Sequence, residues 1–165
     1  MSALAIALAT VALAVRTVGD WSWLVVVSGG AAGLTVPVMR TIDRSTMRWL
    51  VVTAAGVALF ALTRTLWAMQ ISGGRAAIVV GVVAGVAEEA LFRRGLYGLL
   101  ERWGAHAAVL GSAALFGLVH VPLYGWRALP LDVAAGLVFG WQRWSSGSWT
   151  APASTHAFAN AVQYL

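Results

Sequence analysis

The sequence predicts an all-α membrane protein, a polytopic bundle of about six or seven transmembrane helices. The 165 residues are 60% hydrophobic and 10% charged, with a mean hydropathy of +0.81, whereas a soluble domain usually carries about a quarter charged residues. The apolar residues also form runs long enough to cross a bilayer, separated by short polar or Gly/Pro-rich breaks. One small core cannot bury so much apolar surface, so lipid is the expected solvent.

Seven apolar stretches are the expected spans. The sixth is short enough to be a half-span. No basic residue precedes the apolar part of the first stretch, so we expect a membrane span there rather than a cleaved signal peptide. With no internal repeat and no low-complexity linker, residues 1–165 are expected to form one integral membrane domain. The stretches cover residues 2–18, 21–39, 48–71, 76–100, 105–122, 128–142 and 149–165.

Tryptophan and arginine positions indicate how the helices lie in the bilayer. The nine tryptophans mostly mark span boundaries, as in an interfacial aromatic belt: Trp21, Trp23, Trp49, Trp67, Trp103, Trp126, Trp141, Trp144 and Trp149. Arginine-rich loops favour the cytoplasm. This rule places Arg40, Arg44, Arg48, Arg93, Arg94, Arg102 and Arg143 inside, and Arg16, Arg75 and Arg127 outside. We therefore expect a cytoplasmic N-terminus and an outward C-terminus.

Composition also excludes several functions. The chain has no cysteine, so disulfides and thiolate metal sites are impossible. Its net charge of +5 comes without a basic patch interleaved with aromatics, so no nucleic-acid partner is expected. Small residues four apart, at Gly29/Gly33, Gly81/Gly85 and Gly136/Gly140, predict close approaches between membrane helices.

Ionisable residues inside the spans are the strongest indication of function, because they are costly in lipid and usually face a polar interior. Within residues 84–95, AGVAEEALFRRG, Glu89 and Arg93 lie four apart and share one helix face, so they can pair. Glu88 points about 100° away. Adjacent carboxylates in a low dielectric compete for charge, so the pair leaves Glu88 as the group able to titrate. Arg94 is expected to snorkel toward the headgroups.

The same four charges can equally be one structural buried ion-pair network, and the segment alone does not decide. Further along, His120 lies in ALFGLVHVPLYG, and His156 and Asn160 lie four apart in STHAFANAV. A carboxylate, two imidazoles and an amide from three helices suit water activation with oxyanion stabilisation. Arg64 and Asp132 are expected to be structural or interfacial, and His106 to have no functional role.

The ordered motifs resemble those of a known family. Glu88-Glu89-x-x-x-Arg93, Phe116-x-x-x-His120 and His156-x-x-x-Asn160 are similar to the motifs of the CAAX-protease and bacteriocin-processing (ABI) family of intramembrane proteases, which includes type II prenyl-protein endopeptidases. The resemblance covers about residues 77–165, and residues 1–75 match only as accessory transmembrane helices. The short spans fit its myxosortase-like subgroup, which is proposed to process C-terminal membrane anchors.

The resemblance implies an intramembrane glutamate-type peptidase. Glu88 would be the general base on a water, assisted by His120. His156 and Asn160 would donate hydrogen bonds to the oxyanion, and Glu89 and Arg93 would complete and orient the site. The implied substrate is a membrane-anchored protein or peptide, cleaved near its membrane-embedded or C-terminal part, in the inner membrane of a bacterium, with no cofactor.

One local departure and two rival functions accompany this interpretation. The family commonly reads Phe-Arg-Gly, whereas this chain has Phe92-Arg93-Arg94-Gly95, so helix packing around Gly95 is expected to differ by one residue. The first rival is a zinc metalloprotease with Glu88 or Glu89, His120 and His156 as ligands. The second is a non-catalytic membrane scaffold or bacteriocin-immunity protein. A transporter would require a matching polar site in the first half of the chain, which has no acidic residue within a span.

Overall fold

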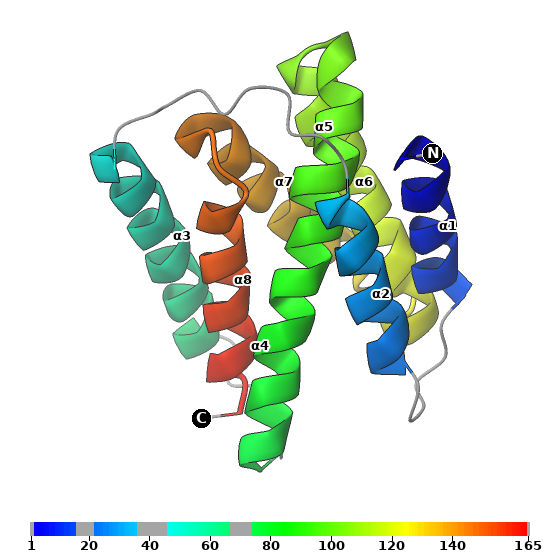
Figure 1. Ribbon diagram of the computed structural model, residues 1–165. Coiled ribbons are helices and arrows are strands. Elements are labelled where there is room, and N and C mark those ends of the chain that lie inside the picture. The colour runs from blue at the N-terminus through cyan, green and yellow to red at the C-terminus, as the bar shows by residue number, and fades with distance from the viewer. Residues whose placement is uncertain (1, 16–21, 36–45, 67–73, 165) are drawn as a thin grey trace.

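The computed structural model describes residues 2–15, 22–35, 46–66 and 74–164, and these residues form an all-α bundle without β-strands. Figure 1 shows the helices standing side by side. Their bounds are α1 Ser2–Val15, α2 Ser22–Leu34, α3 Thr46–Leu66, α4 Arg75–Glu89, the π-helical segment η1 Ala90–Leu96, α5 Tyr97–Leu100, the 3₁₀ turn η2 Glu101–Trp103, α6 Ala105–Tyr124, α7 Leu129–Ser146 and α8 Thr150–Val162.

Each predicted span corresponds to one of these helices or helical rods. The fourth is a continuous rod made of α4, η1 and α5, drawn in green through the middle of Figure 1. Gly104, with a φ of 100°, ends the rod at η2, and Gly125, with a φ of 78°, ends α6, because glycine adopts such backbone angles without steric cost. The sixth stretch is longer than expected, because it forms the 18-residue helix α7.

The central rod contacts helices from both halves of the chain. α4 packs against α2 and α8, η1 packs against α2, and α3 lies against α7 and α8. Gln142 on α7 joins the last group, because its amide nitrogen lies 2.9 Å from Val52 O on α3 and 2.9 Å from Thr155 Oγ1 on α8. Helices expected to be accessory therefore pack directly on those that carry the polar motifs.

Glycines from each of the predicted pairs lie where helices approach closely. A Cβ added at Gly33 on α2 would come within 2.7 Å of Leu91 Cα in η1, and one at Gly136 on α7 within 2.9 Å of Ala113 Cα on α6. Gly85 on α4 faces α8 in the same way, 3.3 Å from Ala157 N. On α2 the second close contact is made by Gly30, adjacent to the predicted Gly29. Small side chains thus let these backbones touch.

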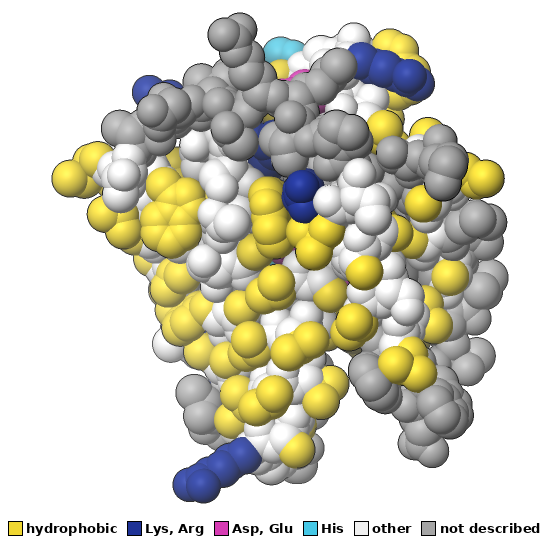
Figure 2. Space-filling view, in the orientation of Figure 1, with side chains coloured by type: hydrophobic (Ala, Val, Ile, Leu, Met, Phe, Trp, Pro, Cys, Tyr) yellow, Lys and Arg dark blue, Asp and Glu magenta, His cyan; other side chains and the backbone are white. Residues whose placement is uncertain are grey.

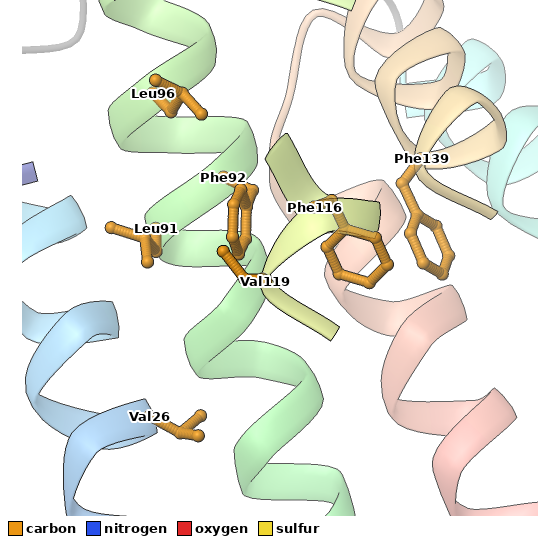
Figure 3. Packing of buried hydrophobic residues seen from close by; sticks show 7 residues of the cluster. All are labelled: Val26, Leu91, Phe92, Leu96, Phe116, Val119 and Phe139. Carbon is orange, nitrogen blue, oxygen red and sulfur yellow. The ribbon is translucent and has the colours of Figure 1, made fainter. Parts of the chain in front are cut away.

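The buried apolar core surrounds the middle of the rod. It consists of residues from α2, η1, α6 and α7, shown in Figure 3: Val26, Leu91, Phe92, Leu96, Phe116, Val119 and Phe139. The rings of Phe92 and Phe116 meet edge to face with centroids 5.3 Å apart, an arrangement that aromatic quadrupoles favour. This packing fixes η1 relative to α6 directly beside the polar residues.

The outer surface is apolar. Among the described residues, two helical segments, Thr46–Thr65 and Ala105–Tyr124, have the length and composition to cross a membrane, and Leu24–Leu34 is a shorter apolar helix. Large apolar side chains such as Met47, Val51 and Val79 point outward, each more than half exposed. In Figure 2 apolar side chains are spread over the described part of the visible face, while the basic ones lie mostly toward its upper and lower ends.

The expected tryptophan belt stays a prediction, and several of its residues can be located in the fold. Trp103, Trp126 and Trp144 are exposed at or near helix ends, where an interfacial indole is stable. Trp21 and Trp67 lie outside the described residues, as do Arg16, Arg40 and Arg44, and the side chain of Trp23 is not described.

Candidate active site

Five of the six predicted site residues meet inside the bundle. Glu88 and Glu89 end α4, Arg93 lies one turn later in η1, and His120 and His156 come from α6 and α8. All five are buried: Glu89 and Arg93 are 0% exposed, and the others 6–7%. Charged groups in such surroundings are stable only when they are paired or hydrogen-bonded, so their partners determine what each can do.

Glu89 and Arg93 form the predicted pair. Arg93 Nη1 lies 3.2 Å from Glu89 Oε1, and both side chains are inaccessible to solvent. Arg93 also donates from Nη2 to Gly136 O on α7 at 2.9 Å. Its guanidinium carbon lies 4.6 Å from the ring centre of Phe116 and 5.3 Å from that of Phe139, distances at which a cation is attracted to an aromatic face. This guanidinium therefore links η1 to α6 and α7.

Glu89 has a second partner. Its Oε1 lies 2.9 Å from His156 Nδ1 on α8. The His156 ring stacks on Phe139, with centroids 4.8 Å apart and an interplanar angle of 20°. An ionised carboxylate is an acceptor only, so Nδ1 carries the proton in this contact. The second ring nitrogen of His156 is then directed to the other side of the ring.

Glu88 faces both imidazoles. Its Oε2 lies 3.6 Å from His120 Nε2 and 3.9 Å from His156 Nε2. His120 is held at its other nitrogen, because Nδ1 lies 2.7 Å from Phe116 O, a carbonyl that can only accept. Nδ1 therefore carries a proton in this contact, and Nε2 is the nitrogen that faces Glu88.

Asn160 lies one turn further along α8 than His156 and has a different contact. Its Nδ2 donates to Gly81 O on α4 at 2.9 Å. Gly81 and Gly85 provide the room for this approach, since a Cβ at Gly85 would lie 3.1 Å from that nitrogen. One N–H of the amide thus joins α8 to α4, and a primary amide has a second N–H to donate.

Arg64 makes a structural hydrogen bond outside this cluster. Arg64 Nε donates to Val162 O at the end of α8 at 3.2 Å, which is the structural role expected for Arg64. In the part of the chain that the structure describes, no group of three or more His, Asp or Glu residues has an arrangement that could hold a metal ion.

Sequence reasoning did not identify three contributors to the site. Gly136 takes part only through its carbonyl oxygen, and Phe139 only through its ring faces. Arg143 on α7, considered before only for topology, lies beside Arg93 with its Nε 3.2 Å from Arg93 O. None of these carries a local sequence signal, except that Arg143 is charged within an apolar helix.

Comparison with known families identifies the chain. A family model described as type II CAAX prenyl endopeptidase Rce1-like matches residues 70–162, which include all three motifs. Comparison with curated proteins gives no match, and neither does comparison with solved structures. The match covers more than half of the chain and agrees with the resemblance seen in its motifs. The chain belongs to the Rce1-like family of type II CAAX prenyl endopeptidases and is an integral membrane protease.

Proposed function

We propose that this protein is a glutamate-type intramembrane endopeptidase in which Glu88 activates a water molecule. The observation that carries the proposal is the position of the Glu88 carboxylate, 3.6 Å from His120 Nε2 and 3.9 Å from His156 Nε2. Glu89, in contrast, is committed to Arg93 and His156 through a single oxygen. Glu88 is thus the carboxylate that faces the Nε2 atoms of both imidazoles, which can exchange protons with it.

The reaction proceeds in two steps, addition of water and departure of the amine. Glu88, assisted by His120, takes a proton from water while the water oxygen bonds to the scissile carbonyl carbon. The proton then passes to the leaving nitrogen, the carbon–nitrogen bond breaks, and the products are a carboxylic acid and an amine. A general base correctly placed for such a transfer contributes about 10²–10⁴-fold to the rate.

The tetrahedral intermediate requires hydrogen-bond donors, and we assign His156 and Asn160 to this role. His156 Nδ1 is held by Glu89 at 2.9 Å, so Nε2 donates when the ring carries its second proton. The same contact with Glu89 fixes the orientation of the ring. Asn160 would donate the N–H that is not directed at Gly81 O. Donors fixed before the reaction stabilise the developing oxyanion without a reorganisation cost.

The proposed substrate is a membrane-anchored protein or peptide, cleaved near its membrane-embedded or C-terminal part. Burial of the cluster inside an apolar bundle supports a scissile bond that is presented within or beside the bilayer. We further propose that the protein crosses the inner membrane of a bacterium several times as a single domain. In that domain residues 77–165 carry the catalytic groups, and residues 1–75 supply accessory helices.

The test is cleavage by purified protein of two probes, a farnesylated CAAX peptide and a peptide ending in a transmembrane anchor. We expect Glu88→Gln and His120→Ala to lower kcat at least about 100-fold on whichever probe the wild type cleaves. Glu101→Gln is the matched control, because Glu101 lies in η2 outside the cluster. It should retain activity within about twofold, since it removes no group placed at the reaction.

Three outcomes separate the rival functions. An active Glu88→Gln protein would refute the proposed base. Loss of wild-type cleavage in chelator, restored by zinc, would favour the metalloprotease. Absence of cleavage by the wild type, with Glu88→Gln retaining the biological activity of the protein, would favour the scaffold or immunity role.

A further inference from the structure

Arg143 is a buried cation that the proposed reaction does not use. It lies on α7, is 7% exposed, and its guanidinium carbon is 5.0 Å from the ring centre of Tyr97 in α5. Its Nε donates to the backbone oxygen of Arg93 at 3.2 Å. A buried charge within a bundle is costly unless it makes such contacts, so its presence there calls for a specific explanation.

The carbonyl that Arg143 contacts has lost its usual helical partner. In a regular α-helix the Tyr97 N–H would donate to Arg93 O, four residues earlier. Here it donates to Phe92 O, five residues earlier, as in a π-helix. Single π-helical turns are rare and occur frequently at functional sites. Arg143 provides a donor to the carbonyl that this change of pairing displaces.

α7 therefore attaches to Arg93 at two points. Gly136 O accepts from the Arg93 guanidinium at 2.9 Å, and Arg143 donates to the Arg93 backbone. Gly136 and Arg143 are seven residues apart and so lie on nearly the same face of α7. One contact fixes the side chain of Arg93, and the other fixes the turn from which that side chain projects.

We propose that Arg143 is a positioning residue for the active site. By holding the π-helical turn, it keeps Arg93 in register with Glu89, and Glu89 in turn fixes His156 at 2.9 Å. Arg143 acts through these residues and does not touch the substrate. The inference rests on the proposed function, in which His156 donates to the oxyanion. It adds to that function a residue on α7.

The experiment compares Arg143→Met with Arg143→Lys. Methionine keeps an apolar stem but removes the charge and the donor, whereas lysine retains both. We expect Arg143→Met to lower kcat about 10–100-fold with KM within about twofold, because small displacements of catalytic groups cost rate rather than binding. Arg143→Lys should recover kcat to within about fivefold of the wild type.

Amide hydrogen exchange supplies a readout that does not depend on activity. In Arg143→Met we expect faster exchange in the peptide covering residues 90–100, with exchange in residues 46–66 unchanged, because opening is local when one contact is lost. Because exchange is measured on protein without substrate, it reports on Arg143 even if Glu88→Gln proves active and the proposed base fails. Should Arg143→Met not fold, Arg143→Gln replaces it in both measurements.

Arg64→Gln is the matched control. Arg64 also donates from Nε to a backbone oxygen of another helix at 3.2 Å, but at the end of α8 rather than at η1. It should leave exchange in residues 90–100 and kcat within about twofold of the wild type. The proposal is overturned if Arg143→Met keeps its kcat, if its loss lies in KM alone, if lysine restores nothing, or if exchange in residues 90–100 is unchanged.

Discussion

At the scale of residues, the site depends on how two adjacent carboxylates are separated. Glu89 is enclosed by Arg93 and His156, whereas Glu88 is directed at His120 and His156. Neighbouring positions on a helix point about 100° apart, so a single turn of α4 directs one carboxylate to a structural pair and the other toward the imidazoles. The two glutamates should therefore differ in what their removal costs.

Loss of Glu89 should mainly destabilise the protein. Glu89→Leu leaves the buried Arg93 without its carboxylate, and breaking one side of a buried pair costs about 3–5 kcal/mol. The double variant Glu89→Leu/Arg93→Met should recover much of that stability without recovering cleavage, because apolar side chains can replace the pair but cannot hold His156. The thermal unfolding midpoint in detergent measures the stability of the single and the double variant, with Glu88→Gln as the reference.

In that series the thermal unfolding midpoint of Glu88→Gln should lie within a few degrees of the wild-type midpoint. A Glu89→Leu protein as stable as the wild type would contradict the structural importance of the pair. If Glu89→Leu and Glu89→Leu/Arg93→Met were equally destabilised, the contacts of the Arg93 guanidinium would contribute the stability, and the unpaired charge would not be the cause of the loss.

Part of this site could be predicted from the sequence. The four-residue spacing predicts the pairing of Glu89 with Arg93, because both residues lie on one helix and their geometry is local. The contact between Glu89 and His156 joins positions 67 residues apart, and only the packing of α8 against α4 creates it. The same packing directs one N–H of Asn160 to Gly81 O, which spacing along α8 could not predict.

At the scale of elements, the π-helical segment η1 is where the chain departs from the motif that it resembles. The additional arginine in Phe92-Arg93-Arg94-Gly95 falls inside Ala90–Leu96. A π-helical turn has more residues than an α-helical one, so it can take up an extra residue while the rod continues into α5. η1 is also the part of the rod that α2 approaches most closely at Gly33.

A methyl group at that approach should disturb the bundle. In Gly33→Ala the new Cβ would meet backbone atoms of Ala90 and Leu91, which cannot move aside as a side-chain tip can. We expect a loss of about 1–3 kcal/mol in unfolding free energy. Cleavage should also fall, because Ala90 follows Glu89 directly. The thermal unfolding midpoint and kcat are the measurements.

Gly98→Ala is the control on the same rod. Nothing lies within 4 Å of a Cβ at Gly98, and alanine is the better helix former, so this variant should be unchanged or more stable by up to about 1 kcal/mol. If Gly33→Ala behaved like Gly98→Ala, the contact between α2 and η1 would be looser than the structure indicates.

Helix positions were predictable because apolar runs end at glycine and polar breaks, and Gly104 and Gly125 mark the ends of η2 and α6 in both sequence and structure. The length of α7 was underestimated. Gln142, Arg143 and Ser146 interrupt the apolar pattern and suggested an end, yet all three are buried against neighbouring helices. The π-helical turn had no clear sequence signal, because propensity does not separate it from an α-helix.

At the scale of the whole molecule, the first described helix starts near the end of the bundle opposite to the one where α8 finishes (Figure 1). An odd number of crossings would produce this arrangement. Sequence supplied the expected direction through arginine counts, but the structure contains no membrane and so leaves the direction as a prediction. The absence of cysteine from the chain makes it directly measurable.

Single cysteines at the two ends of α6 should report opposite sides of the membrane. Trp103 and Trp126 are 61% and 70% exposed, and the intervening α6 is about 30 Å long, enough to cross the hydrocarbon core. We expect Trp126→Cys to react with an impermeant maleimide in intact cells, and Trp103→Cys only after permeabilisation. The reverse pattern would invert the topology, and labelling of both would show that α6 does not cross.

The length of the central rod has a consequence for the lipid around it. From Arg75 to Leu100 the rod measures about 39 Å at 1.5 Å per residue, while the hydrocarbon core is only about 30 Å thick. A helix longer than its bilayer tilts, kinks or thickens the membrane locally. Because Glu88 and Glu89 lie in the middle of this rod, tilting moves its ends toward the headgroups while the carboxylates keep their depth. A change in bilayer thickness should therefore alter the tilt of the rod and leave the two carboxylates near the middle of the hydrocarbon core.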